Sequence, residues 1–284
     1  MEAAEHTEDG RSRLRRCLEA IVLVVIVVAI GLVFDMSVSA YVALSFPATV
    51  VFQLLVRRRP LNEMWVRRGP ALSRATVIAW LAVLLATPPL IALIVKSFSS
   101  GQVIWFLVVA AGAVPASYVI AQRAPDTVRM IFLCLATGGL VGTAVLALNI
   151  AADIDDIAKL KSNFLGVAGN DALAFVENYA ILWPGYYMVE EVLFRGSIDS
   201  HVHHIGERHW FWSAIFVSLL WGFWHLPIVA GEGSAAVVIA NMFVLQGLVG
   251  PFLSYWWRRS GNLIVPAATH DFLDTFRNVF EGGP

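Results

Sequence analysis

Long apolar runs separated by short polar connections dominate the pattern of this chain. The first run, IVLVVIVVAIGLVF, follows the basic segment RSRLRRC, and no small-residue cleavage site comes after it. It therefore predicts an uncleaved transmembrane helix rather than a signal peptide. Further apolar runs lie near residues 38–56, 74–95, 103–121, 130–150, 172–194, 210–230, 235–257 and 262–280. Since a helix needs about 20 apolar residues to cross a bilayer, we predict an all-α, polytopic transmembrane helical bundle with eight or nine membrane segments.

Basic residues occur in alternate connections between these runs. Arginines precede the first run and follow the second, fourth and eighth, whereas the other connections are short or acidic, such as AADIDDIAKLK. By the positive-inside rule, this alternation predicts a multi-pass protein with its N-terminus in the cytoplasm. We expect it in the cell (plasma) membrane.

The composition agrees with a membrane protein and argues against other classes. Hydrophobic residues make up 58% of the chain and charged residues 14%, against about 25% charged residues in a soluble domain. The formal net charge is -1, so nothing suggests a nucleic-acid partner, and the apolar composition makes membrane lipid an expected partner. The two cysteines, Cys17 and Cys134, form no CxxC pattern, so neither a disulfide framework nor a zinc ribbon is predicted.

Ionisable residues inside the apolar runs are the first sign of function, because each costs at least about 2.5–3.5 kcal/mol on insertion. MVEEVLFRGS contains Glu190, Glu191 and Arg195. Glu191 and Arg195 are four residues apart and would pair on one helix face, whereas Glu190 is rotated by about 100°. The group is either an ion pair at the membrane border with a spare glutamate, or a supporting pair beside a carboxylate that can act as a base.

Two further apolar segments contain histidines. SLLWGFWHLP places His225 one helical turn after Trp221, and GNLIVPAATHDFLDTF places His270 and Asp274 on one helix face, with Asp271 pointing elsewhere. Taken separately, His225 could be an interhelical hydrogen-bond donor and the His270–Asp274 pair a helix-border contact.

The polar connection HVHHIGERH has the composition of a metal-binding tract. Its spacing fits no standard zinc pattern, so we expect a solvated cytoplasmic loop. If the flanking segments form a hairpin that turns near residues 206–208, Glu190 and His225 lie at similar depth on neighbouring helices. With His270 from the last segment, they could converge on one water molecule and activate it for hydrolysis.

The sequences EEVLFRG, WGFWH and HDFLD, in this order, resemble the signature of the CPBP family, which comprises CAAX proteases and bacteriocin-processing enzymes. The family pattern is EExxxR, then FxxxH, then HxxxN or HxxxD, and the resemblance covers about residues 172–280. The expected organisation is therefore a polar cytoplasmic N-terminal segment (1–17), N-terminal transmembrane helices (18–171) and a CPBP-like catalytic core (172–284).

The resemblance implies a membrane-embedded protease, a hydrolase that cleaves membrane-associated or prenylated CAAX-type peptide or protein substrates. It implies that Glu190 is the general base, assisted by His225, and that His270 and Asp274 stabilise the oxyanion. Glu191, Arg195 and Trp221 would support these groups. The family has been described both as metalloproteases and as metal-independent glutamate proteases. Zn bound by Glu190, His225 and His270 is therefore an open alternative.

Two residues depart from the family pattern. Trp221 stands in place of phenylalanine, and because both are bulky aromatics the change puts little in doubt. Asp274 stands where better-studied members have asparagine. An ionised aspartate would repel an oxyanion, so Asp274 must be protonated, orient His270 or bind a metal.

Two other functional hypotheses compete with the protease. A proton-coupled transporter would use the buried carboxylates and histidines as a relay, and would need a polar path across the bilayer. A non-catalytic CPBP-like protein, serving as an immunity factor or scaffold, would keep the fold without the reaction. The sequence gives no oligomeric state.

Overall fold

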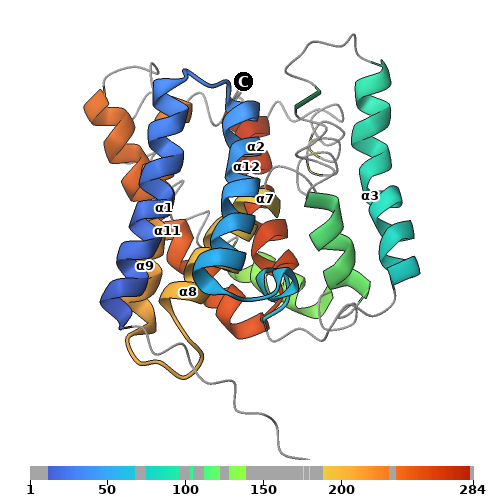
Figure 1. Ribbon diagram of the computed structural model, residues 1–284. Helices are drawn as coiled ribbons and strands as arrows, with labels where there is room; N and C mark the ends of the chain where they lie inside the picture. Colours follow the sequence, from blue (N-terminus) through green and yellow to red (C-terminus); the bar gives the residue numbers. More distant parts are fainter. Residues whose placement is uncertain are drawn as a thin grey trace, which may run out of the picture.

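The computed structural model is predominantly helical over the part of the chain that it describes (Figure 1). This part contains no strand, and its single antiparallel bridge joins Val66 to Asn262. The predicted all-α class is therefore confirmed. The described residues are 12–67, 75–95, 103–104, 112–121, 128–138, 175, 179, 188–229 and 235–281.

The N-terminal elements are α1 (Arg13–Val33), α2 (Val38–Val51), the π-helix η1 (Phe52–Arg57), the 3-10 helix η2 (Leu61–Met64) and α3 (Ala75–Val95). The C-terminal elements are α7 (Met188–Glu191), the π-helix η4 (Val192–Asp199), α8 (Ser200–Val202), α9 (Trp210–Trp224), α10 (Leu226–Val229), α11 (Ala235–Ser260) and α12 (Ile264–Glu281). Helix α1 begins earlier than its apolar run, because the Ser12 side chain caps it by accepting from the Arg15 backbone N–H.

Three helical segments are long and apolar enough to cross a membrane: Arg13–Val33, Val38–Arg57 and Trp210–Val229. Shorter apolar helices cover Ala75–Thr87, Gly112–Ala121 and Val128–Gly138. The predicted count of eight or nine membrane segments is not confirmed. Helix α12 has only 18 residues and includes two aspartates, an arginine and a glutamate. The predicted segments 103–121, 130–150 and 172–194 lie partly outside the described residues.

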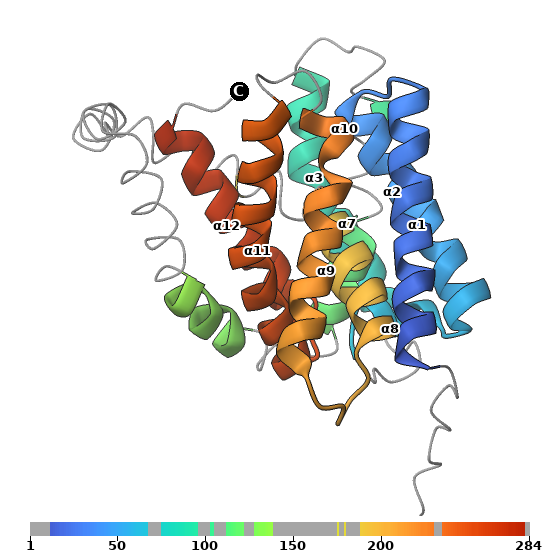
Figure 2. The ribbon, with the colours of Figure 1, turned by 90° about the vertical axis from the view of Figure 1, so that its left-hand side faces the viewer.

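Helix α9 lies between α1 and α11 (Figure 2), and its main partner is α11. These two helices approach closely where Gly250 faces Ser218, since a Cβ on Gly250 would lie 2.2 Å from the Ser218 Oγ. Small residues allow such an approach between membrane helices. A core of Val, Leu, Phe and Trp side chains from α1, α2, η4 and α9 fills the space beside this pair.

The segment that follows η1 locks η4 and the start of α12 in place. Gly196 packs so tightly against η2 that a Cβ there would lie 2.3 Å from the Met64 carbonyl oxygen. The Leu263 N–H donates to the Trp65 carbonyl over 3.1 Å, and the Arg67 N–H donates to the Gly261 carbonyl over 2.8 Å. The segment that follows η1 thus contacts both η4, which carries Arg195, and the residues at the start of α12, the helix that carries His270.

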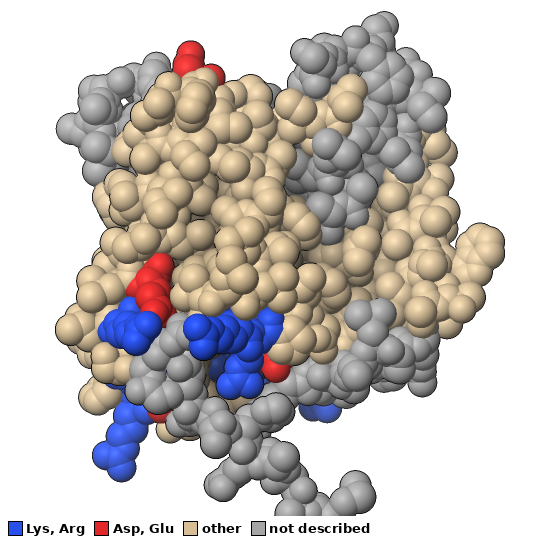
Figure 3. Space-filling model, viewed as in Figure 1, with Lys and Arg blue, Asp and Glu red and all other residues tan. Residues whose placement is uncertain are grey.

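Basic side chains gather at the end of the bundle where α1 begins (Figure 3). Arg13, Arg67 and Arg258 come from three distant segments, and all three bind the region between residues 199 and 210. The segments that carry the basic residues therefore meet at one end. The hairpin predicted between the segments that carry Glu190 and His225 is also present, since residues 203–209 connect α8 to α9 at this end.

Candidate active site

The three motifs lie on three segments that meet inside the bundle. Glu190 and Glu191 belong to α7, Arg195 to η4, Trp221 and His225 to the end of α9, and His270 and Asp274 to α12. The carboxylates of Glu190 and Glu191, the Arg195 guanidinium and the His270 ring are all buried, with at most 3% of each residue exposed. His225 is half-buried, and 24% of the Asp274 side chain is exposed.

Glu191 connects two of these segments. Its Oε2 lies 3.4 Å from the Arg195 Nε, which is the pair that the sequence spacing predicted. Its Oε1 lies 3.0 Å from the Nδ1 of His270 on α12, a contact that sequence spacing does not predict. One carboxylate therefore binds a cation on its own segment and a histidine from another helix.

The backbone around Arg195 is π-helical, not α-helical as the spacing argument assumed. A π-helix bonds each residue to the fifth along, and such turns are frequent at functional sites. Residues four apart remain neighbours in this geometry, so the Glu191–Arg195 pair survives the change.

Glu190 has a different partner from Glu191. The Trp221 indole Nε1–H donates to the Glu190 Oε2 over 3.1 Å, between two buried side chains. The Arg195 Cζ lies over the face of the same indole, 4.7 Å from the ring centroid. Phenylalanine at position 221 could not donate this hydrogen bond. The departure from the family pattern at this position thus adds a polar contact to a bulky aromatic side chain.

Trp221 also contacts both histidines of the site. Its ring meets the His270 ring edge-on, with 4.8 Å between the centroids, and lies 5.7 Å from the His225 ring. The His225 Nδ1 is 2.9 Å from the Trp221 carbonyl oxygen, one turn earlier in the helix, and so donates to it. Glu190, His225 and His270 thus surround one indole.

His270 lies between two carboxylates. Its Nδ1 faces Glu191, and its Nε2 is 3.4 Å from the Asp274 Oδ2 on the same helix. Of the three roles considered for Asp274, this contact supports the orientation of His270. A histidine that donates from both ring nitrogens is the doubly protonated form.

The zinc alternative does not fit this arrangement. A histidine binds a metal through a ring nitrogen that is free of a proton, and both His270 nitrogens face carboxylates. Within the described residues, no three His, Cys, Asp or Glu side chains are grouped so that they could hold a metal ion.

Sequence reasoning missed the contacts that fix the end of α9. The Tyr41 hydroxyl donates to the Trp224 carbonyl over 2.8 Å, and the Trp224 Nε1–H donates to the Ser45 Oγ over 3.0 Å. Tyr41 and Trp224 also stack at 5.0 Å. These bonds from α2 hold the backbone immediately before His225. A tyrosine and a serine four residues apart in an apolar run were the available signal.

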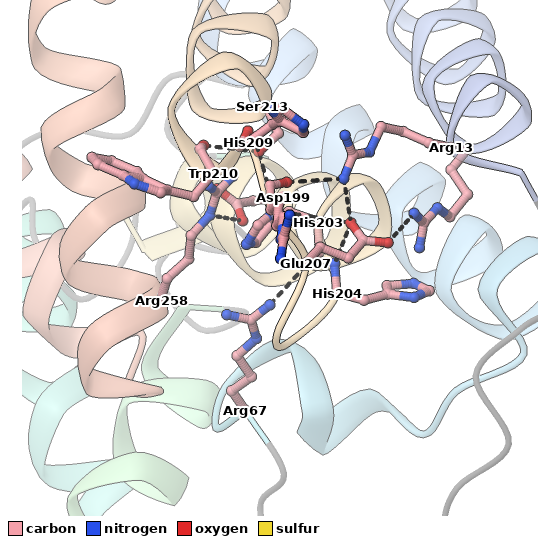
Figure 4. A network of polar contacts seen from close by, with 12 residues as sticks. Arg13, Arg67, Asp199, His203, His204, Glu207, His209, Trp210, Ser213 and Arg258 are labelled. Atoms are coloured by element: carbon pink, nitrogen blue, oxygen red, sulfur yellow. Dashed lines mark hydrogen bonds and ion pairs between the residues drawn. The ribbon is translucent and has the colours of Figure 1, made fainter.

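The expectation of a solvated loop at HVHHIGERH is wrong for His201 and His203, which are buried. Glu207 gathers the loop: it binds Arg13 over 3.3 Å, pairs with Arg16, and accepts from the His204 backbone N–H over 3.2 Å (Figure 4). The loop is therefore bound to the start of α1 through Glu207. Tertiary contacts, such as that of the His201 ring with Glu19 on α1, bury histidines that look exposed in sequence.

Burial shifts the ionisation of this loop. Burial, reinforced by the Arg258 charge, lowers the pKa of His203 from 6.5 to about 4, so the ring is neutral near pH 7. Burial alone would raise the pKa of Glu207, but the hydrogen bond from Arg16 and that from the His204 backbone outweigh it and hold the pKa low. Near neutral pH the loop thus contains an ionised Glu207 among arginines and a neutral His203.

Comparison with known proteins agrees with the motifs. Residues 173–276 match the family model of the type II CAAX prenyl endopeptidase Rce1-like proteins. This confirms the resemblance to the CPBP family over the part of the chain that carries all three motifs. No curated protein and no solved structure matches the chain. The matched family is one of CAAX-type intramembrane proteases, which are hydrolases, and the long apolar helices of this chain indicate an integral membrane protein.

Proposed function

We propose that this protein is an intramembrane endopeptidase that hydrolyses peptide bonds of membrane-associated or prenylated CAAX-type substrates. The observation that carries the proposal is the convergence of Glu190, His225 and His270 on the Trp221 indole. A buried carboxylate and two histidines gathered around one side chain form an arrangement that can activate water. The surrounding apolar core would strengthen each electrostatic interaction.

In the proposed reaction, Glu190 takes a proton from a water molecule, and His225 assists in polarising that water. The resulting hydroxide adds to the carbonyl carbon of the scissile peptide bond. The C–N bond then breaks, and the proton held by Glu190 passes to the departing amine. The products are a carboxylic acid and an amine, so atoms and charges balance.

His270 is proposed to stabilise the oxyanion of the tetrahedral intermediate. Its contacts with Glu191 and Asp274 support a cationic ring, since a histidine that donates to two carboxylates carries both protons. A fixed positive charge near the developing oxyanion lowers the barrier without reorganisation. Glu191 and Asp274 then act by holding this ring, and Arg195 balances the Glu191 charge.

The orientation in the membrane belongs to the same proposal. The arginines of α1, the segment after η1 and the end of α11 meet at one end of the bundle, which supports a cytoplasmic N-terminus in the cell membrane. His225 follows the last residue of α9, so it lies towards the other end of that helix. The reacting groups would thus lie within the membrane and away from the basic end.

The direct test uses the purified protein in proteoliposomes with a fluorogenic, farnesylated peptide that ends in a CAAX sequence. Glu190→Gln keeps the shape of the side chain but removes the base, so cleavage should fall at least about a thousandfold, within the range of general base catalysis. His225→Ala should lose most activity. Glu63→Gln, on η2, is the matched control and should cleave at the normal rate. Full cleavage by purified Glu190→Gln would overturn the assignment of Glu190 as the base, whereas absence of cleavage by the parent protein would favour the non-catalytic alternative.

A further inference from the structure

Trp221 contacts four of the polar residues of the proposed site, namely Glu190, Arg195, His225 and His270. Trp221 donates its indole N–H to Glu190 over 3.1 Å, meets the His270 ring edge-on at 4.8 Å, and accepts at its backbone carbonyl from His225. Its face carries the Arg195 guanidinium at 4.7 Å. Such a set of contacts exceeds what packing of an apolar side chain requires.

We propose that Trp221 is a positioning residue for the general base. Its N–H holds one oxygen of the Glu190 carboxylate and so directs the other oxygen towards the reacting water. This inference rests on the proposed role of Glu190 as base. It assigns to the indole nitrogen a task in catalysis, which the ring alone cannot perform.

The indole itself is held firmly, as a positioning group must be. Only 3% of Trp221 is exposed. Arg195 covers one face, the His270 ring abuts the indole, and Phe194 lies 6.3 Å away on η4. The donor is therefore fixed before substrate binds, and a donor that needs no reorganisation contributes most to catalysis.

The alternative is that Trp221 only fills space between α7, α9 and α12. The two readings differ in one atom, because phenylalanine keeps an aromatic ring that can pack against Arg195 and His270 but has no N–H. Trp221→Phe therefore removes the proposed positioning contact and retains most of the packing. A packing role predicts loss of stability alone, whereas a positioning role predicts loss of kcat.

Trp257→Phe is a matched control elsewhere in the bundle. Trp257 is also fully buried, and its Nε1–H donates to the Ser200 Oγ over 3.1 Å, the same distance as in the Trp221–Glu190 bond. Both substitutions thus remove one buried indole hydrogen bond and a similar ring volume. They differ in whether the lost acceptor is Glu190.

The experiment measures kcat, KM and the thermal midpoint for both variants in proteoliposomes, with the farnesylated CAAX peptide as substrate. A hydrogen bond to a charged group contributes about 1.5–3 kcal/mol. If this bond positions the Glu190 carboxylate, Trp221→Phe should lower kcat about ten- to a hundredfold. KM should stay within about twofold. Trp257→Phe should keep kcat within about twofold while its midpoint falls as much as that of Trp221→Phe.

A kcat for Trp221→Phe equal to that of Trp257→Phe would overturn the positioning role. Glu190→Gln, assayed in parallel, separates this result from failure of the proposed function. If Glu190→Gln is inactive while Trp221→Phe is fully active, the protease stands and the positioning inference falls. If Glu190→Gln remains active, Glu190 is not the base and the premise of the positioning inference fails; if the parent protein does not cleave the peptide, the proposed function itself fails.

Discussion

The Glu191 carboxylate joins His270, 79 residues away in the sequence, to Arg195 on its own segment. Its Oε1 is 3.0 Å from the His270 Nδ1, and its Oε2 is 3.4 Å from the Arg195 Nε. Both partners and the carboxylate are buried. Glu191 therefore links the first motif to the third. The contact that holds α7 against α12 is the same contact that would orient His270.

The first prediction concerns Glu191→Gln. The Arg195 guanidinium is fully buried, and none of its nitrogens has a hydrogen-bond partner within the described part of the chain, so Glu191 supplies its compensating charge. Removing one partner of a buried ion pair costs about 3–5 kcal/mol. We expect a loss of this size in the free energy of unfolding, measured by denaturant titration in detergent micelles.

Arg15→Gln is the control for that measurement. Arg15 pairs with Glu19 at 3.0 Å, but 65% of its side chain is exposed, and exposed pairs contribute about 0–1 kcal/mol. The double variant Glu191→Gln/Arg195→Met should regain part of the stability lost by Glu191→Gln, because it no longer buries an unpaired charge. A Glu191→Gln protein as stable as Arg15→Gln would contradict the buried-pair argument.

The residues that the sequence predicted correctly are those related by local geometry. The helical class follows from apolar runs, and the Glu191–Arg195 and His270–Asp274 pairs follow from a spacing of four. The contacts between segments could not be read in this way. The Trp221–Glu190 hydrogen bond and the Glu191–His270 contact depend on how α7, α9 and α12 pack. The burial of His203 likewise depends on tertiary contacts, and the π-helical backbone of η4 has no simple sequence signal.

The second prediction concerns Asp274, which lies 3.4 Å from the His270 Nε2. Asp274→Asn keeps an oxygen that can accept from this nitrogen but removes the charge, whereas Asp274→Ala removes both. A charged acceptor is worth about 1 kcal/mol more than a neutral one, so Asp274→Asn should lower kcat by less than about tenfold. Asp274→Ala should lower it further. Steady-state cleavage of the farnesylated peptide measures both, and equal, unchanged rates would exclude an orienting role.

The third prediction concerns Gly196, the residue after Arg195. An added Cβ would lie 2.3 Å from the Met64 carbonyl oxygen, and because that atom is backbone, η2 or η4 must move. Gly196→Ala should therefore lower the free energy of unfolding by about 1–3 kcal/mol, and it should reduce cleavage because η4 carries Arg195.

Gly247→Ala is the control for that substitution. Gly247 lies in α11, and among the described residues no atom outside its own turn of the helix comes within 4 Å of an added Cβ. Alanine is favoured over glycine in a helix by about 0.5–1 kcal/mol, so this variant should be at least as stable as the parent protein. Thermal unfolding in micelles compares the two. Equal midpoints for Gly196→Ala and Gly247→Ala would show that η2 moves away from the added Cβ without loss of stability.

The last prediction concerns pH and the loop that is bound to the start of α1. The pKa of His203 falls from 6.5 to about 4 on folding, chiefly through burial. Between these values the unfolded chain holds a proton that the folded chain lacks, so stability rises with pH across this window. As the pH falls from 6.5 towards 4, the protein should lose stability by at most about 1.4 kcal/mol per pH unit from this group.

His203→Gln removes the titrating ring and should flatten the dependence of the thermal midpoint on pH between 6.5 and 4. His209→Gln, in the exposed part of the same loop, should leave the slope unchanged. Glu207 acts in the same direction but at lower pH, because its pKa is below 4.5 and its stabilising charge is lost only as the pH falls through that lowered value. A slope that persists in His203→Gln across this window would show that another group takes up the proton. A slope that disappears would identify His203 as the group whose burial makes the stability of the folded protein depend on pH in this window.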